Sequence, residues 1–471
     1  FVGGVGDDTI TIGVTTKAIV TGAGNDTVTS TGVVGTGGSV DFGDGTLDTI
    51  VLTGAQADAA DATSTFNSKF TNFEVLSLAT GATETLDMVG LGNVSLVTTI
   101  GANGLTLSNF VTSGTFTLTG PSTKATVVVR DAAFNATDTL NVTLSNSSAD
   151  TDIFGEVVAA NVETINISMV DAGTGTSVPA TIDTATLTAV NATKVVVSGN
   201  NGLTLANTTS VNVLSFDASG VVADSGAFDT AANLAVTYVS AATSTTKAVT
   251  IVGGAGDDVL TGNTAVVHSS SSITGGEGKD KITGSKGVDT INLAETTAAA
   301  DTVIFAVTAN NGIDTIAGFA AGSGADIAQV VAASTTAGTT GGNTAVFGTS
   351  TNTTLTTGAQ AFALTGASTN TDDVIEINAT LSSFGDLGKA GVVDGAELLK
   401  ALSANNTAAA SITSAGNDED AYLVAYQNGN AYLYEVANGG TNTAIVAAEI
   451  FLVGVFTGVA QGAFVSGDFT V

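Results

Sequence analysis

The stretch Gly275-Gly276-Glu277-Gly278-Lys279-Asp280-Lys281-Ile282-Thr283 is followed directly by Gly284-Ser285-Lys286-Gly287-Val288-Asp289-Thr290-Ile291-Asn292. Both follow one nine-residue pattern, in which glycines precede an aspartate and an apolar residue lies two positions after it. Glycine reaches backbone angles that other residues avoid, so each loop can turn tightly and direct several carbonyl oxygens toward one point. The apolar residue begins a short strand whose side chain points inward. Two such nonapeptides make one turn of a parallel β-roll, which brings equivalent loops together about every 18 residues.

The same pattern recurs elsewhere in the chain. Full matches span residues 3–11 and 253–261, and degenerate matches span 21–29 and 42–50, the last with one extra residue before its aspartate. Asp8 and Asp26 are 18 residues apart, as one turn requires. Asp258 and Asp280 are 22 residues apart, which we interpret as one full turn with an insertion. The segment 12–20 contains no aspartate, so we expect the opposite edge of the first turn to be free of metal.

The residue types in the pattern are those that bind calcium. Ca²⁺ takes roughly 6–8 oxygen ligands, and glycine carbonyls with one carboxylate from each of two stacked loops supply such a set. Asp301 and Asp314 begin aspartate-x-apolar steps without the glycines, and we include them as less regular sites. The alternative is a series of ordinary Gly-Asp turns, which the repeated spacing disfavours. The predicted Ca²⁺ ligands are Gly4, Gly6, Asp8, Gly22, Gly24, Asp26, Gly43, Gly45, Asp48, Gly254, Gly256, Asp258, Gly276, Gly278, Asp280, Gly287, Asp289, Asp301 and Asp314.

Composition restricts the possible partners. Acidic residues outnumber basic ones 43 to 11, and a net charge of −32 repels itself unless cations neutralise the carboxylates. Arg130 is the one arginine and the lysines are scattered, which argues against nucleic acid. No cysteine is present, so neither disulfides nor thiolate metal sites hold the fold. The apolar runs are too short for a transmembrane segment, and the start at Phe1 leads us to expect that an N-terminal portion has been removed.

The predicted fold class is all-β, a parallel β-roll or β-solenoid with calcium-binding loops and a minor helix near the C-terminus. We predict a first β-roll at 1–54, a duplicated, strand-rich, solenoid-like region at 55–246, a second β-roll at 247–320 and a C-terminal β-rich domain at 321–471. The duplication places Glu74 and Glu163 in like contexts, 89 residues apart. A pair of β-sandwiches is the alternative for the duplicated region, and we favour the solenoid.

Two local signals stand out in the C-terminal region. Asp394 can cap a short helix through Leu402, with Glu397 as the reciprocal capping partner. The turn Asn428-Gly429-Asn430 separates two alternating segments and predicts a β-hairpin.

Catalytic signals are missing from the sequence: His268 is the one histidine, so a two-histidine zinc motif is impossible, and a Gly-x-Ser-x-Gly sequence does not occur. We therefore expect a protein that is not an enzyme.

Three stretches of the chain resemble the RTX-type surface-layer (S-layer) proteins of Caulobacter-type α-proteobacteria, namely residues 1–54, 195–220 and 247–292. The resemblance extends beyond the calcium repeat at residues 15–20, 37–40 and 215–219. The resemblance implies a secreted protein whose chains form a calcium-dependent, two-dimensional hexameric lattice on the bacterial cell surface. It also implies attachment to lipopolysaccharide through an N-terminal region that is missing from this sequence.

Residues 429–434 and 449–454 resemble the C-terminal regions of other RTX proteins exported by type I secretion machinery, which implies an uncleaved signal at the C-terminus. The apolar residues 464–471, with few charges, suit that role. A calcium-dependent RTX adhesin or biofilm-matrix protein would share the same export, metal and fold, and it remains the alternative function.

Overall fold

The computed structural model describes residues 1–470 except 33, 80, 147–150, 172–181, 225–229, 268–269, 306–310, 331–345, 350–360, 364–372, 378, 404–410, 414–420 and 438–443. His268 therefore lies outside the described residues. The chain is mostly β-strands that pair in parallel along successive turns, which confirms the predicted β-solenoid. Its contacts divide it into two compact units, Phe1–Ala242 with Gly254–Gly256, and Thr243–Gly253 with Asp257–Val471. The predicted division into four regions stays a prediction.

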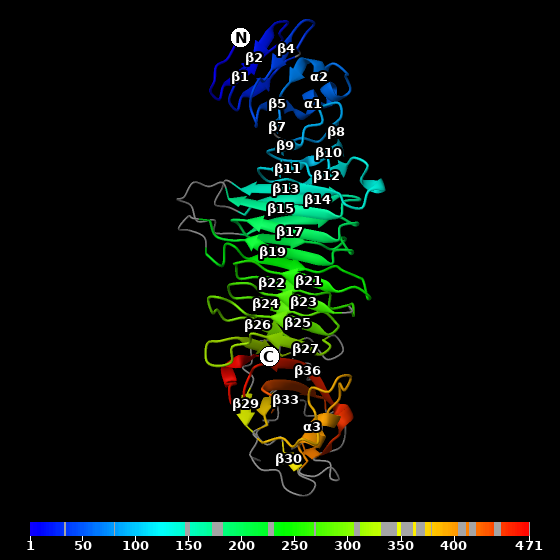
Figure 1. Cartoon of the computed structure of the whole chain (residues 1–471), viewed down its shortest axis with the longest axis vertical. Helices are drawn as coiled ribbons and strands as arrows, with labels where there is room; N and C mark the ends of the chain where they lie inside the picture. Colours follow the sequence, from blue (N-terminus) through cyan, green and yellow to red (C-terminus); the bar gives the residue numbers. More distant parts are fainter. Residues whose placement is uncertain are drawn as a thin grey trace. The chain divides into compact units, whose positions relative to one another are not determined.

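In the first unit each turn of the chain adds one strand to each of two faces (Figure 1). One face comprises β1 (Thr9–Ile12), β3 (Thr27–Ser30), β5 (Thr49–Thr53), β7 (Val75–Ala79), β9 (Leu96–Thr99), β11 (Thr115–Leu118), β13 (Thr139–Asn146), β15 (Thr164–Asp171), β17 (Lys194–Gly199) and β19 (Ser215–Val221). The other comprises a separate sheet of β2 (Ala18–Val20), β4 (Ser39–Asp41) and β6 (Phe70–Thr71), then β8 (Thr85–Asp87), β10 (Asn103–Phe110), β12 (Lys124–Val129), β14 (Ile153–Ala159), β16 (Asp183–Thr188), β18 (Leu203–Ala206) and β20 (Val236–Val239). The connections contain α1 (Gly54–Asp61), α2 (Phe66–Lys69) and a 3₁₀ turn at Ala132–Phe134.

The register of the strands follows the spacing of the aspartates. Thr9 pairs with Thr27 and Ser271 with Asp289, which confirms the predicted 18-residue turns. Val259 pairs with Lys281, so the 22-residue interval is one full turn, as predicted. Alternate residues of each strand point inward and stack on the same position of the next turn.

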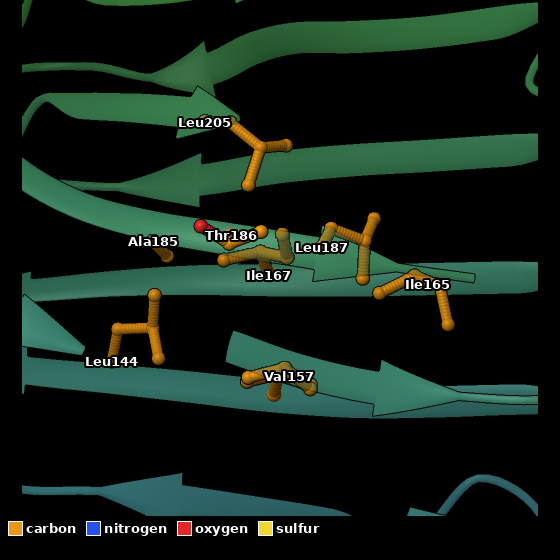
Figure 2. Close-up of a pocket in the computed structure, with 9 residues that line it drawn as sticks. Leu144, Val157, Ile165, Ile167, Ala185, Thr186, Leu187 and Leu205 are labelled. Atoms are coloured by element: carbon orange, nitrogen blue, oxygen red, sulfur yellow. The ribbon is translucent and has the colours of Figure 1, made fainter. Parts of the chain in front are cut away.

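The interior between the two faces is filled with side chains. Figure 2 shows Leu144, Val157, Ile165 and Leu187 meeting there from strands of both faces. The space they leave is about 10 Å³, close to the minimum for one water molecule. This part of the solenoid is therefore a packed core.

The second unit continues the same design over fewer turns. One face comprises β21 (Val249–Val252), β23 (Ser271–Thr274), β25 (Asp289–Asn292) and β27 (Asp314–Ala317), and the other comprises β22 (Val259–Thr261), β24 (Lys281–Thr283), β26 (Thr302–Ile304) and β28 (Ile327–Gln329). The last turn is built by the end of the chain, because β36 (Ile450–Thr457) pairs in parallel with β27 and β37 (Phe469–Thr470) with β28.

An insertion separates these last two turns in the sequence. It contains β29 (Val346–Thr349), β30 (Ala361–Ala363), β31 (Asp373–Glu376), α3 (Ala396–Ala401), β32 (Ser411–Thr413), β33 (Ala421–Gln427), β34 (Asn430–Val436), β35 (Ala444–Ile445) and a 3₁₀ turn at Ala447–Glu449. After the insertion, another 3₁₀ turn, Ser466–Asp468, precedes β37. β33 and β34 form the predicted antiparallel hairpin, and Asn428 and Gly429 both have positive φ, as this kind of turn requires.

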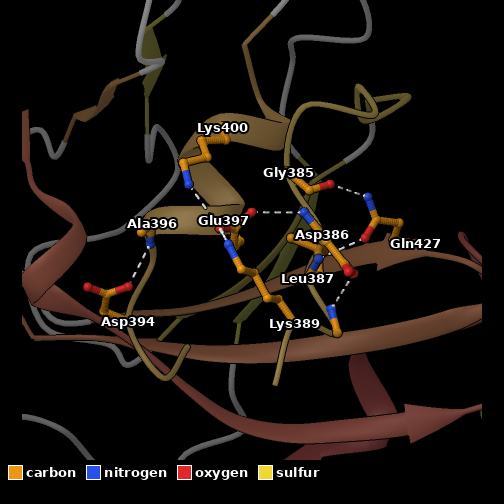
Figure 3. Close-up of polar contacts among 10 residues, drawn as sticks. Gly385, Asp386, Leu387, Lys389, Asp394, Ala396, Glu397, Lys400 and Gln427 are labelled. Carbon is orange, nitrogen blue, oxygen red and sulfur yellow. Dashed lines mark hydrogen bonds and ion pairs between the residues drawn. The ribbon is translucent and has the colours of Figure 1, made fainter. Parts of the chain in front are cut away.

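The predicted capping of the short helix is wrong. Gly395 is the N-cap of α3, and Asp394 accepts the N–H of Ala396 at 3.1 Å without acting as the side-chain cap. Glu397 does not reach back to the cap, because its carboxylate lies between Lys389 and Lys400, each at 2.9 Å (Figure 3). These two ion pairs lower the pKa of Glu397 to about 2.

Candidate metal centres

Acidic residues at the start of successive strands form a continuous chain of contacts in the first unit. The N–H of Asp8 donates to Asp26 Oδ1 at 2.7 Å, and the N–H of Asp26 donates to Asp48 Oδ1 at 2.6 Å. The N–H of Asp48 donates in turn to Glu74 Oε2 at 3.0 Å. We call this series, Asp8, Asp26, Asp48 and Glu74, the first carboxylate ladder. The structure thus brings together the three aspartates that the repeat predicts and adds a glutamate to them.

The two middle residues of the first carboxylate ladder are buried and incompletely paired. Asp26 and Asp48 are 0% exposed, and the Oδ2 atom of each has no hydrogen-bond partner among the described residues. Burial raises the pKa of Asp48, and the nearby charges of Glu74 and Asp26 raise it further, although the hydrogen bond from Asp26 lowers it. A buried carboxylate oxygen without a partner is costly, so these two atoms could accept a positively charged ligand.

The second unit contains an equivalent series, the second carboxylate ladder, formed by Asp258, Asp280, Asp301 and Asp326. The N–H of Asp258 donates to Asp280 Oδ1 at 2.9 Å, and that of Asp280 donates to Asp301 Oδ1 at 2.8 Å. The N–H of Asp301 donates to Asp326 Oδ1 at 2.9 Å. All four residues are buried, with at most 2% of their surface exposed.

A third carboxylate lies beside the middle of the second ladder. Ligand oxygens of Asp280, Glu295 and Asp301 all lie within 4.8 Å of one another. Asp280 Oδ2 and Glu295 Oε1 are buried and have no hydrogen-bond partner among the described residues. Calcium binds oxygen at about 2.3–2.6 Å, so two of its ligands can be up to roughly 5 Å apart. The three carboxylates are therefore close enough to share one calcium ion.

The electrostatics of this cluster favour a cation. Burial raises the pKa of Asp280 to about 9, and the charges of Asp258, Asp301 and Glu295 add to the effect. Burial likewise raises the pKa of Asp301 to about 7 and raises those of Glu295 and Asp326. Like charges held together away from water disfavour ionisation, so these groups need either protons or a positive ion. A divalent cation would satisfy both the charge and the orphaned oxygens.

Asp289 and Asp314 form a separate pair, because they begin strands of the other face. The N–H of Asp289 donates to Asp314 Oδ1 at 3.1 Å, while the Asp289 carboxylate accepts the N–H and hydroxyl of Ser285. Asp314 Oδ2 has no hydrogen-bond partner among the described residues, and burial raises the pKa of Asp314 well above its usual range. The degenerate repeat at 284–292 thus builds the same arrangement with a serine in its loop.

The glycines of the repeats have two different roles. A Cβ on Gly275 would lie 2.1 Å from Asp280 Oδ2, and one on Gly45 would lie 2.3 Å from Asp48 Oδ2, so these glycines make room for the carboxylate. Gly276 and Gly278 instead have φ of 115° and 104°, which residues with a side chain rarely adopt. Of the other predicted glycines, Gly22, Gly24 and Gly43 also have positive φ. Gly4 and Gly6 are exposed, and Gly287 donates its N–H to Ser285 Oγ. Gly254 and Gly256 belong to the first unit.

The sequence reasoning missed several acidic residues at these centres. Glu74 and Asp326 complete the two ladders, and each is followed two positions later by a buried apolar residue, as in the repeats. The Gly3, Gly253 and Gly275 positions, which pack against the carboxylates, were also not singled out. Glu295 lies in a loop, and no pattern around it signals a ligand.

The C-terminal strand approaches the second ladder as well. Asp468 precedes β37, is 0% exposed, and accepts the N–H of Gly322 at 3.0 and 3.1 Å through its two oxygens. Its charge also contributes to raising the pKa of Asp326. The end of the chain therefore adds one more carboxylate near this edge of the second unit.

Comparison with known proteins identifies no family: no family model matches the chain, and no curated protein matches its sequence. Among the described residues, no helix is long and apolar enough to cross a membrane.

Proposed function

We propose that this chain is a calcium-dependent structural protein of the bacterial cell surface, which folds on binding Ca²⁺ at its carboxylate ladders and then assembles into a two-dimensional S-layer lattice. The observation that carries the proposal is the cluster of Asp280, Glu295 and Asp301, with two buried oxygens that have no hydrogen-bond partner in the described structure.

The chemistry of the ligands supports calcium over other metals. The chain has no cysteine and one histidine, so the soft and imidazole ligands of transition metals are essentially missing. Mg²⁺ usually keeps several waters and demands near-ideal octahedral geometry. Buried carboxylates among tight glycine loops instead offer many oxygens in a flexible arrangement, which suits Ca²⁺.

The architecture supports a structural role. The residues that line the interior in Figure 2 are apolar except for Thr186, and the strand pairing repeats from turn to turn. Chains with a net charge of −32 repel one another, so ordered assembly requires cations at or near the contacts. The hexameric lattice and the attachment to lipopolysaccharide come from the resemblance of the repeats and their flanking residues to S-layer proteins.

Calcium would also couple export to folding. Where calcium is scarce, the raised pKa values and crowded carboxylates disfavour the folded second unit. The chain would then stay unfolded for type I secretion and fold outside the cell, where binding energy becomes folding energy.

The test is a calcium titration of the purified chain, followed by circular dichroism and by electron microscopy of the product. We expect β structure to form as calcium is added, and ordered sheets to appear in millimolar calcium, to be missing in sodium chloride of equal ionic strength and to dissolve on chelation. Full β content in chelator, unchanged by calcium, would overturn calcium-dependent folding. Calcium-dependent fibres or amorphous material in place of sheets would favour the adhesin or biofilm-matrix function.

A further inference from the structure

A pair of acidic residues in the first unit lies far from any glycine repeat. Asp138 precedes β13 and Glu163 precedes β15, which pair in parallel. The N–H of Asp138 donates to Glu163 Oε2 at 2.9 Å. In return, the carbonyl of Asp138 accepts the N–H groups of Glu163 at 3.2 Å and of Thr164 at 3.1 Å.

The last step of the first carboxylate ladder has the same three hydrogen bonds. The N–H of Asp48 donates to Glu74 Oε2 at 3.0 Å, and the carbonyl of Asp48 accepts the N–H groups of Glu74 at 3.0 Å and of Val75 at 2.9 Å. The two pairs span similar turns, of 26 residues for Asp48 and Glu74 and 25 for Asp138 and Glu163. The solenoid therefore repeats one carboxylate arrangement where the sequence pattern of the repeats has disappeared.

The same carboxylate oxygen is left over in both places. Asp138 is 3% exposed, and its Oδ2 atom, like that of Asp48, is buried and has no hydrogen-bond partner among the described residues. Lys194 begins the strand of the next turn, opposite Thr164, but it is exposed and forms no ion pair with either carboxylate. Leaving an ionised oxygen buried without a partner is costly, so the site needs a positive ligand that the described chain does not supply.

We propose that Asp138 and Glu163 hold a calcium ion outside the glycine repeats. Both ligands are hard oxygens, and backbone carbonyls of the adjoining loops are the other oxygens available, which matches the preference of Ca²⁺. This proposal depends on the proposed function in one respect: it assumes that the matching pair, Asp48 and Glu74, binds calcium. Its consequence is that turns of the first unit that lack the glycine-aspartate repeat are also stabilised by calcium.

The experiment counts bound calcium on the full chain. Equilibrium dialysis at saturating calcium, followed by elemental analysis, gives the number of ions per chain for the wild type and for Asp138→Asn, Glu163→Gln, Lys194→Gln and Asp217→Asn. We expect the first two variants each to lose one ion per chain. Lys194→Gln and the control Asp217→Asn should keep the wild-type number. The Asp217 carboxylate accepts the N–H and the hydroxyl of Ser219 on its own turn.

The outcomes separate this proposal from the proposed function. Asp280→Asn is measured alongside: if it loses calcium while Asp138→Asn and Glu163→Gln keep the full number, the Asp138 site is wrong and the ladders remain. If Asp280→Asn also keeps every ion, calcium binding by the second ladder is wrong. Should Asp138→Asn fail to fold in saturating calcium, as judged by circular dichroism, the folded Glu163→Gln variant decides, because a full calcium count there overturns the site.

Discussion

Without calcium, the second unit should become less stable as the pH rises, and Asp280 should be a main cause. Burial raises the pKa of Asp280 from 3.8 to about 9. Between these values the folded chain keeps a proton on this carboxyl group that the unfolded chain has released. Unfolding therefore releases a proton, and the free energy of unfolding falls with increasing pH.

The size of the effect follows from the linkage between proton binding and stability. One bound proton changes the free energy of unfolding by about 1.4 kcal/mol per pH unit, so Asp280 alone contributes a loss on the order of 3 kcal/mol between pH 5 and pH 7. Asp301, with a pKa raised to about 7, acts in the same direction over this range. Ca²⁺ reverses the preference, because it binds the ionised carboxylates; a site filled at 100 times its Kd adds about 2.7 kcal/mol.

Asp280→Asn isolates this contribution from the general repulsion of an acidic chain. In chelator, where protons on the buried carboxyl groups stabilise the folded chain toward pH 5, urea unfolding followed by circular dichroism should show a shallower pH dependence for the variant than for the wild type, by about 1.4 kcal/mol per pH unit. In saturating calcium the order should reverse, with the variant less stable because it has lost a ligand. Hydrogen exchange of the segment 258–283 localises the change to the second ladder. Parallel pH dependences of wild type and variant in chelator, or wild-type stability that rises from pH 5 to pH 7, would refute the reasoning.

Three further changes test other parts of the structure. Gly275→Ala places a Cβ 2.1 Å from Asp280 Oδ2, so it should destabilise the second unit by about 1–3 kcal/mol and weaken calcium binding in calcium-titrated melts. The control Gly467→Ala has open space around it and should do neither. Asp468→Asn weakens the contact with Gly322, and we expect faster hydrogen exchange at residues 320–328 with little change in the first unit; equal exchange in both proteins would contradict the contact. Glu397→Gln removes a carboxylate whose pKa is lowered to about 2 by two lysines. The stability that this carboxylate provides should be present above pH 4.5 and lost as the pH falls toward 2. A free energy of unfolding at pH 6 equal to that of the wild type would contradict this.

The turns of the solenoid could be predicted because the pattern is local. An 18-residue interval between Asp8 and Asp26 fixes the register of β1 on β3, and the apolar residue after each aspartate fixes which face of the strand is buried. The same logic extends to Glu74, where glutamate replaces aspartate and the glycines are lost. What signals this position is an acidic residue two places before a buried apolar one, a pattern too common to be identified without the neighbouring turns.

Glu295 could not be predicted for a different reason. It reaches the second ladder from the loop that follows β25, and its position depends on how that loop folds over the turn below. Local residue types do not determine such a path. The same limit applies to the last turn, because β36 returns to β27 after an insertion of more than a hundred residues, and the contact between Asp468 and Gly322 spans 146 residues.

The return of the chain end also bears on the proposed export. The segment 464–471, which the sequence suggests as part of a secretion signal, contributes Phe464 and Phe469 to the interior, where they are 3% and 0% exposed. Export machinery could bind these side chains only before the last turn closes. Asp468 lies in the same segment and beside the second ladder, so binding of calcium there favours closure and burial of the segment. Calcium outside the cell would thus complete the fold and bury the proposed signal in the same step. Residues 464–471 would then be either accessible to the export machinery or packed in the folded unit, but never both.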